Sequence, residues 1–460
     1  MRASLASSIA VTCAAVLALP VSLTVPAAAT APPAAAPALP PAPELPGSTQ
    51  SLPLEPLGAA TRALGDAAGS GAQGLTRRDV RPFSLVGVVW DDPAAPLHGA
   101  VQVRTRATGG GAWSPWQDVE THNEEHGADP GTAEGSARAL RGSTAPLWVG
   151  DSDGVEIRVR GEEPLPAGLR LELVDPGEDP AAAPEETAPR TRGAAAPAAR
   201  AAAGAAEEAA GAVNARLAPH GATWIPALSK EETEIEARNV PQARAVPAGP
   251  AAAAAAKPYI GPRPKIITRK GWGADERIRE KGFVYTKTIK AAFVHHSATG
   301  NNYTCKQAPS VLRSIYRYHV KSSGWRDFGY NFAVDKCGNI YEGRAGGVAK
   351  PVMGAHTLGF NTDSMGIAVL GTFSRSAPPA AAVTAIARLT AWKLGLHGVN
   401  PKGTSYLISG GGNLYKKGKK VRFNAIAGHR DGFATDCPGG RLYNKLGTAR
   451  TSSAKYQGRL

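Results

Sequence analysis

The sequence predicts two folded regions of different class, an all-β region over residues 81–176 and a larger α/β region over residues 258–451. Three observations lead to this division. Short runs with apolar residues at every second position fill the first region, strand and helix patterns alternate in the second, and Ala/Pro-rich stretches flank the first. We therefore expect a small sandwich-like domain followed by an α/β domain with a central mixed β-sheet flanked by helices.

The β-rich region is assigned from its spacing of apolar residues. Val101–Arg106, Val155–Val159 and Leu169–Leu173 alternate between apolar and polar positions, and Leu85–Trp90 is apolar throughout. Gly, Asp and Pro separate these segments, as is typical of the turns in a sandwich or barrel. The region is expected to bind wall polysaccharide, to act as a spacer, or to serve as a regulatory cap, and its sequence does not choose among these roles.

The α/β region contains strand and helix signals in turn. Apolar runs predict buried strands, apolar residues three and four positions apart predict helices, and a proline opens the second helix, where it is tolerated. The expected elements are a strand over Ala291–His296, a helix over Pro309–Lys321, a hairpin of Tyr330–Asp335 and Asn339–Glu342, a strand over Met365–Leu370 and a helix over Pro378–Leu396.

The N-terminal residues have the pattern of a secretory signal peptide. Arg2 precedes an apolar stretch over residues 9–25, and small residues follow at positions 27–29. Since no second run is apolar and long enough to span a bilayer, residues 1–30 are expected to be removed on export and no membrane span is expected.

Ala- and Pro-rich composition predicts linkers over residues 31–80 and 177–257, and residues 452–460 are expected to form a tail. The first linker is expected to be disordered. Within the second, a short helix over Ser229–Asn239 is predicted, with Ser229 as its N-cap and Glu232 three residues later.

The net charge of +14 indicates a polyanionic partner, because the lysines and arginines are concentrated in the C-terminal half of the chain. Nucleic acid and an anionic cell wall both fit that charge. No zinc-finger spacing and no basic motif interleaved with aromatic residues is present, so nucleic acid is not expected as a partner.

Three cysteines remain after removal of the predicted signal peptide, and an odd number in an exported chain leaves one without a disulfide partner. His429 and Cys437 lie eight residues apart across a glycine-containing loop, which can bring imidazole and thiolate to one metal ion. A third ligand is expected from His295 or His296. Because adjacent residues of a strand point to opposite faces, only one of that pair can reach the metal.

Six blocks of the α/β region, in order, resemble the peptidoglycan recognition protein and phage-lysozyme-like N-acetylmuramoyl-L-alanine amidase family. The usual entry to that domain is matched by Trp272-Gly273-Ala274. The blocks are His295-His296-Ser297-Ala298, Gly324 to Phe332, Tyr341-Glu342-Gly343-Arg344, Gly354 to Thr357 with Asn361, Ser364 to Ile367, and Gly428-His429-Arg430 through Cys437-Pro438-Gly439.

The resemblance implies a zinc (Zn²⁺) site formed by His295, His429 and Cys437. It implies that Tyr330 lies beside the reacting water and stabilises the oxyanion, and that Thr435 hydrogen-bonds the water or the intermediate. One branch of the family carries a glutamate in the strand that matches residues 366–371, but this sequence has only apolar residues and glycines there. Catalysis is therefore expected to depend on the metal and Tyr330.

Five further residues match positions that contact the glycopeptide in the family. The residues expected to bind substrate are accordingly His356, Thr357, Asn361, Arg344 and Trp325. His356 could equally be a loop histidine that holds the fold. Arg344 and Trp325 could instead pack under the groove, and packing is the preferred role for Trp325.

The two remaining cysteines, Cys305 and Cys337, are expected to form a disulfide, because the family often has one in this region and the chain is expected to be exported.

The function implied by the resemblance is zinc-dependent hydrolysis of the amide bond between N-acetylmuramic acid and L-alanine in peptidoglycan. The alternative is a non-catalytic module that binds peptidoglycan, and the presence of the cysteine ligand favours the enzyme. The chain is expected to be a secreted, wall-associated monomer from a high-GC actinobacterium, with peptidoglycan and anionic wall polymers as partners.

Overall fold

The computed structural model describes residues 47–57, 71–179, 198–239 and 259–459, which belong to one compact unit. The predicted signal peptide, residues 1–30, lies outside the described residues. Within the described part of the chain, no helix is long and apolar enough to cross a membrane.

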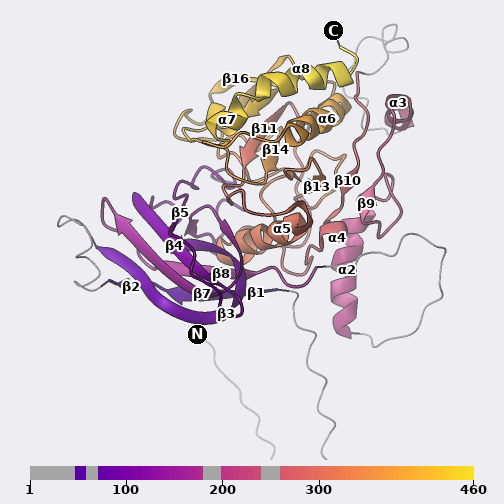
Figure 1. Cartoon of the computed structure of the whole chain (residues 1–460). Helices are drawn as coiled ribbons and strands as arrows, with labels where there is room; N and C mark the ends of the chain where they lie inside the picture. Colours follow the sequence, from indigo (N-terminus) through magenta and orange to yellow (C-terminus); the bar gives the residue numbers. More distant parts are fainter. Residues whose placement is uncertain (1–46, 58–70, 180–197, 240–258, 460) are drawn as a thin grey trace, which may run out of the picture. The chain divides into compact units, whose positions relative to one another are not determined.

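The β-rich region forms an eight-stranded sheet with the order β1-β8-β3-β7-β4-β5, in which β2 and β6 also pair with β3 (Figure 1). All of its strand pairs are antiparallel. The strands are β1 (Ser48–Pro53), β2 (Glu55–Pro56), β3 (Ala72–Trp90), β4 (Gly99–Ala107), β5 (Gln117–Val119), β6 (Gly142–Ser143), β7 (Leu147–Gly161) and β8 (Arg170–Asp175).

The sheet resembles a sandwich because its two long strands, β3 and β7, each contribute residues to both halves of the sheet. Early in β3, Leu75 pairs with Ile157 of β7, whereas Val86 later in β3 pairs with Leu173 of β8. Register shifts interrupt the β3–β7 pairing between these points, as expected where strands bend. Apolar side chains from both halves meet in one core, so the expected sandwich-like domain is present.

The apolar run Leu85–Trp90 is buried on both faces, which explains why it does not alternate. Val86 and Val88 point into the core of the β region. Leu85 and Val89 instead pack in a second core that contains helix α5 (Ala308–Arg317) of the α/β region. The β region therefore has an apolar outer face, and the α/β region covers it.

The expected linker over residues 31–80 is wrong in part, since β1, β2 and the beginning of β3 lie within it. β1 pairs with β8 over its full length. Its side chains are only partly buried, as suits an edge strand, so its sequence lacks the apolar alternation that marks the other strands. Order at this edge comes from backbone pairing, which composition does not reveal.

The α/β region is built on a seven-stranded mixed sheet with the order β17-β11-β14-β12-β13-β10-β9, which confirms the expected fold class. β17, β11, β14 and β12 run parallel, and β12 and β13 form the expected hairpin. The strands are β9 (Trp224–Ile225), β10 (Ile266–Ile267), β11 (Ala291–His296), β12 (Phe332–Val334), β13 (Ile340–Glu342), β14 (Ser364–Val369) and β17 (Ile426–Gly428).

Helices cover both faces of this sheet. α6 (Ala380–Leu396) and α8 (Leu446–Tyr456) pack together against one face, where their apolar side chains share a core with alternate residues of β11 and β14. α5 lies on the other face (Figure 1). The remaining elements are the short helices α4 (Arg269–Trp272) and α7 (Gly440–Tyr443) and a two-stranded sheet of β15 (Thr404–Ile408) and β16 (Lys420–Asn424).

The second expected linker, residues 177–257, also contains structure. It includes α2 (Ala198–Ala212), β9 and α3 (Lys230–Asn239), and β9 adds to the edge of the mixed sheet by pairing with β10. α3 has the predicted cap, because the Glu232 amide donates to Ser229 Oγ and the Ser229 amide donates to the Glu232 carboxylate. Alanine-rich sequence suits a helix as well as a linker, so composition alone misassigned this stretch.

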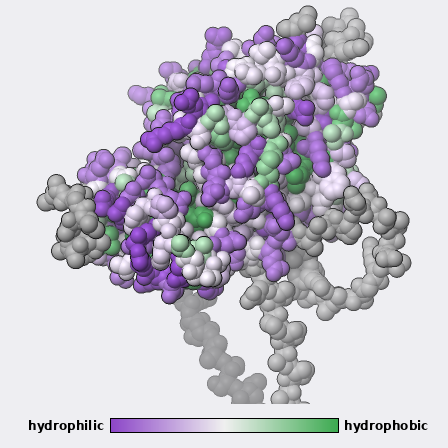
Figure 2. Space-filling view, in the orientation of Figure 1, coloured by the Kyte–Doolittle hydropathy of each residue, from purple (hydrophilic) through white to green (hydrophobic). Residues whose placement is uncertain are grey.

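The predicted tail is partly helical, since α8 continues through Tyr456. Its Ala454 is buried against the domain. Figure 2 shows that hydrophilic residues lie over both regions on the viewed face and that hydrophobic residues form only small patches there.

A close backbone approach joins the two regions. Tyr318, just after α5, is fully buried, and its hydroxyl donates to the carbonyl oxygens of Val88 and Thr144 of the β region, at 3.2 and 3.1 Å. A Cβ atom on Gly87 would lie 2.4 Å from the Tyr318 hydroxyl oxygen. Only glycine at this position leaves room for the tyrosine.

We expect Gly87→Ala to destabilise the chain by about 1–3 kcal/mol, because it overpacks this contact. Thermal unfolding measures the effect. Gly447→Ala is the matched control, since a Cβ atom there meets nothing within 4 Å in helix α8. Equal melting temperatures for Gly87→Ala and the wild type would contradict the tight contact.

Candidate metal centre

The parallel strands β11 and β17 place one histidine each at the same edge of the mixed sheet. Val294 of β11 pairs with Gly428 of β17, so the next residues, His295 and His429, lie side by side where the strands end. Their ring centroids are 4.4 Å apart. Ligand sites commonly lie at the carboxyl ends of parallel strands, and this pair follows that rule.

Cys437 completes the predicted group of three. Its Sγ lies 3.8 Å from Nδ1 of His295, and the thiol is buried. Nε2 of His295 lies 3.4 Å from the Thr357 hydroxyl. A proton on Nε2 shared with Thr357 leaves Nδ1 unprotonated toward the cysteine, which is the usual arrangement behind a histidine ligand.

His296 lies outside this group, as strand geometry requires. Its Nδ1 accepts a 3.3 Å hydrogen bond from the backbone amide of Phe373. The choice between His295 and His296 that the residues left open is therefore decided in favour of His295 as the histidine beside Cys437.

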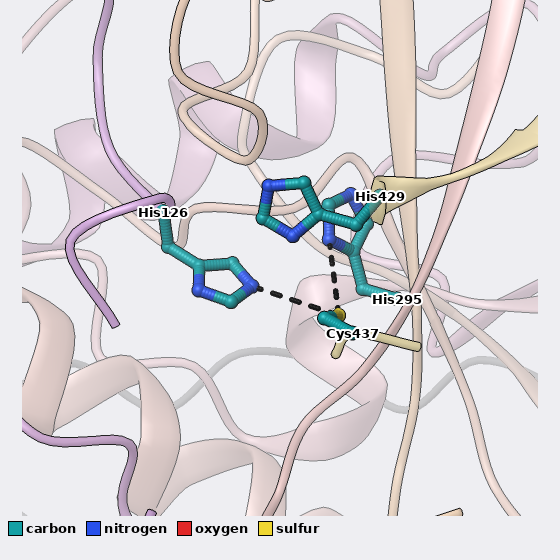
Figure 3. Close-up of side chains that lie close together, drawn as sticks. All are labelled: His126, His295, His429 and Cys437. Atoms are coloured by element: carbon teal, nitrogen blue, oxygen red, sulfur yellow. Dashed lines mark hydrogen bonds between the residues drawn. The ribbon is translucent and has the colours of Figure 1, made fainter. Parts of the chain in front are cut away.

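A fourth residue joins the cluster from the β region. One ligand atom each of His126, His295, His429 and Cys437 lies within 4.8 Å of all the others (Figure 3). Nε2 of His126 is 4.0 Å from Cys437 Sγ, and its ring centroid is 4.6 Å from that of His429. Sequence reasoning assigned His126 no role, and its only signal was the local run His122-Asn123-Glu124-Glu125-His126.

The chemistry of the cluster fits a divalent metal ion. Both ring nitrogens of His429 are buried without a hydrogen-bond partner among the described residues. Burial lowers the pKa of His295 and His429 well below the usual value, which keeps both imidazoles in the neutral form that metals bind. Burial also raises the pKa of the Cys437 thiol, and a bound cation is the charge that would favour its thiolate.

The donor types point to zinc. A tetrahedral zinc ion with ordinary Zn–S and Zn–N bonds holds sulfur and nitrogen about 3.5 Å apart, close to the distances of 3.8 and 4.0 Å seen here. Imidazole and thiolate together are typical zinc ligands.

Tyr330 and Thr435 lie beside the cluster. The Tyr330 ring centroid is 5.2 Å from that of His295, and burial raises the pKa of its phenol well above the usual value, so it remains a hydrogen-bond donor. The Thr435 hydroxyl accepts from the amide of Cys437 at 3.1 Å and donates to Glu125 of the β region at 2.7 Å.

The predicted substrate residues are all buried in this structure. The Thr357 hydroxyl lies 3.0 Å from Nδ1 of His356, and Asn361 accepts from the backbone amides of both residues. Arg344 forms a two-pronged ion pair with Glu134 of the β region. Trp325 stacks on His319 with 4.4 Å between centroids, which supports packing beneath the groove.

A cavity of about 390 Å³ opens next to the cluster. Tyr330, Thr435 and Cys437 line it from the α/β region, and Glu125 and His126 line it from the β region. It is large enough for a small ligand only.

The expected disulfide is present between Cys305, which precedes α5, and Cys337 in the β12–β13 turn. The free cysteine of the described chain is Cys437.

We expect replacement of Cys305 and Cys337 by serine to lower the free energy of unfolding by roughly 3–4 kcal/mol, because the bond closes a loop with a sequence separation of 32 residues. Denaturant unfolding with and without reductant measures this. The prediction would be contradicted if reductant did not change the stability of the wild type and if the wild type were no more stable than the variant.

Family models match both regions of the chain. The N-acetylmuramoyl-L-alanine amidase family model matches residues 285–440, and a model described as Rv3811 N-terminal galactose-binding domain-like matches residues 32–199. Peptidoglycan-recognition protein SC2 of Drosophila melanogaster is 31% identical over 185 residues, which cover 40% of this chain and 85% of that protein.

Two further similarities cover the same region. The human N-acetylmuramoyl-L-alanine amidase is 31% identical over 189 residues, 40% of this chain and 28% of that protein. A solved structure of peptidoglycan recognition protein-LE in complex with tracheal cytotoxin aligns with 40% of this chain and 92% of its own at 29% identity and a TM-score of 0.32. On the strength of the relatives that it matches over most of their length, this chain belongs to the family of peptidoglycan recognition proteins and N-acetylmuramoyl-L-alanine amidases.

Proposed function

We propose that this protein is a zinc-dependent N-acetylmuramoyl-L-alanine amidase, which hydrolyses the amide bond between N-acetylmuramic acid and L-alanine in peptidoglycan. The observation that carries the proposal is the buried group of His295, His429 and Cys437 beside the Tyr330 ring and a cavity. Zinc bound there would supply a Lewis acid and lower the pKa of a coordinated water to roughly 7.

The chain's own residues would orient and stabilise the reaction. His295, His429 and Cys437 would hold the metal, and the hydrogen bond between Nε2 of His295 and the Thr357 hydroxyl would orient the imidazole. The protonated Tyr330 hydroxyl would donate to the oxygen of the scissile carbonyl as negative charge develops on it. Thr435 would hydrogen-bond the attacking water.

The competing function is peptidoglycan binding without cleavage. The relatives include proteins named for recognition and one named for amidase activity, so membership of the family does not decide between the two. A buried thiol next to two neutral histidines favours the enzyme, because a module that only binds ligand has no use for a metal centre of this kind.

We also propose that the protein is secreted and acts as a monomer at the cell wall. Four exposed lysines at the turn that leads into β16 and at its first residue would attract anionic wall polymers: Lys416, Lys417, Lys419 and Lys420. This attraction would weaken as salt concentration rises.

The test is a digest of purified disaccharide–peptide muropeptide by the zinc-loaded chain, read by mass spectrometry. Wild type, His126→Ala and Cys437→Ala are compared. Intact disaccharide and a peptide with a new L-alanine amino terminus are expected from His126→Ala, at a lower rate from the wild type, and not from Cys437→Ala. If neither the wild type nor His126→Ala releases peptide although both bind zinc and peptidoglycan, the protein is a recognition module.

A further inference from the structure

The segment between β5 and β6, residues 120–141, crosses the candidate site from the β region; we call it the cap segment. Its contacts are made with the residues expected to bind metal and substrate. They include five buried or partly buried groups: Glu125, His126, Gly127, Asp129 and Glu134.

His126 lies where a fourth ligand would. Figure 3 shows its imidazole directed at Cys437, on the side of the cluster opposite the strand that carries His295. The Nδ1 atom of His126 is buried without a hydrogen-bond partner among the described residues. Because Nε2 of His126 lies 4.0 Å from Cys437 Sγ and its ring adjoins those of His295 and His429, the imidazole is placed to serve as a metal ligand.

The number of protein ligands decides what such a centre can do. A catalytic zinc site has three protein ligands and an open position, whereas a site with four protein ligands is closed and structural. With His126 in place, the cluster holds three imidazoles and one thiolate. That set satisfies a tetrahedral ion and leaves no position for water.

The cap segment also contacts the residues that the family resemblance assigns to substrate binding. Glu134 pairs with both terminal nitrogens of Arg344 at 2.8 Å, with both side chains at most 4% exposed. Asp129 accepts from the side-chain amide of Asn361 at 2.7 Å and from the amide of Gly359 at 2.8 Å. Glu134 neutralises the charge of Arg344, and Asp129 accepts the hydrogen bond that the Asn361 side-chain amide can donate. The family resemblance implies that both of these residues bind the glycopeptide.

Further contacts bring the cap segment to the metal side of the groove. The Leu358 amide donates to the carbonyl of Glu125 at 2.9 Å, and the Thr435 hydroxyl donates to the carboxylate of Glu125. Thr357 and Asn361 are no more than 1% exposed. A glycan strand with its stem peptide therefore has no access to these residues, and the remaining cavity of about 390 Å³ does not reach them.

We propose that the cap segment holds the protein in a latent form, in which His126 is a fourth zinc ligand and Glu125, Asp129 and Glu134 fill the substrate groove. This inference rests on the proposed zinc amidase function. In the active form the segment leaves the groove, His126 is released, and the metal regains an open position.

The first test uses the cobalt-loaded full chain and needs no activity. Ligand-field absorption is recorded for wild type, His126→Ala and the exposed-histidine control His98→Ala, each titrated with sodium azide. We expect wild type and His98→Ala to share one spectrum that azide leaves unchanged, and His126→Ala to have a different spectrum that azide shifts. Identical spectra and azide responses for wild type and His126→Ala would overturn the proposal.

The second test measures whether the cap segment limits substrate binding and cleavage. Binding to insoluble peptidoglycan and muropeptide cleavage are compared for wild type, His126→Ala and Glu134→Ala. Opening the cap is expected to raise cleavage at least tenfold in His126→Ala and to raise binding in Glu134→Ala. Lower cleavage by His126→Ala at equal zinc content would overturn the proposal, because it would make His126 part of the catalytic machinery. If all chains are inactive while azide still distinguishes His126→Ala, the proposed amidase function fails and the fourth ligand stands.

Discussion

Replacement of His295 by asparagine is expected to abolish zinc binding and amidase activity, whereas the same change at His296 leaves zinc bound. The two residues are adjacent, buried and in one strand, so they form a matched pair. His295 faces Cys437 at 3.8 Å, and His296 instead accepts from the amide of Phe373, a bond that asparagine can replace.

The size of this effect follows from the role of the metal. An amidase without its Lewis acid loses both the activated water and the main source of charge stabilisation, so a loss of at least roughly 10³-fold is expected. Zinc content is measured by elemental analysis on both variants, and peptide release is measured by mass spectrometry with each change made in the His126→Ala chain. Stoichiometric zinc in His295→Asn, or loss of zinc in His296→Asn, would show that the ligand set is wrong.

Replacement of Tyr330 by phenylalanine is expected to lower kcat by about 10²- to 10³-fold without loss of zinc, because removal of one oxyanion donor has an effect of that size. The measurement is made in the His126→Ala chain, in which the proposed fourth ligand is absent. KM is expected to change little, since the donor acts mainly on charge that develops during the reaction.

Tyr316→Phe is the control for this change. Its hydroxyl donates to the backbone carbonyl of Asp275 at 3.1 Å, away from the metal, so its loss removes one structural hydrogen bond and leaves kcat unaltered. A kcat for Tyr330→Phe within about threefold of the parent would remove Tyr330 from the mechanism, given the size of effect expected for an oxyanion donor.

The sequence predicted the parts of the fold that have a strong periodic pattern. β11, β14, α5 and α6 lie within a few residues of the expected ranges, because their apolar spacing reports burial directly. β1 and α2 were missed because an edge strand and an alanine-rich helix have no such pattern. Their order depends on pairing and packing with distant residues.

Of the residues in the candidate metal site, only those from the α/β region could be predicted from the sequence. His295, His429 and Cys437 lie in motifs, and their convergence follows from parallel strands that end at one edge of the sheet. His126 lies 169 residues before His295 in a domain of another class, in a segment without regular structure. The apolar outer face of β3 and β8 packs on α5, and polar contacts with Arg344 and Asn361 hold the segment beside the cluster.

The coordination of zinc in the loaded full chain tests the central claim most directly. X-ray absorption at the zinc edge is expected to give three nitrogen and one sulfur neighbour in the wild type. In His126→Ala it is expected to give two nitrogens, one sulfur and one new light-atom neighbour from solvent. A zinc ion without a sulfur neighbour, or a wild type that fails to bind zinc in stoichiometric amount, would contradict the account of a metal centre assembled from both regions of the chain.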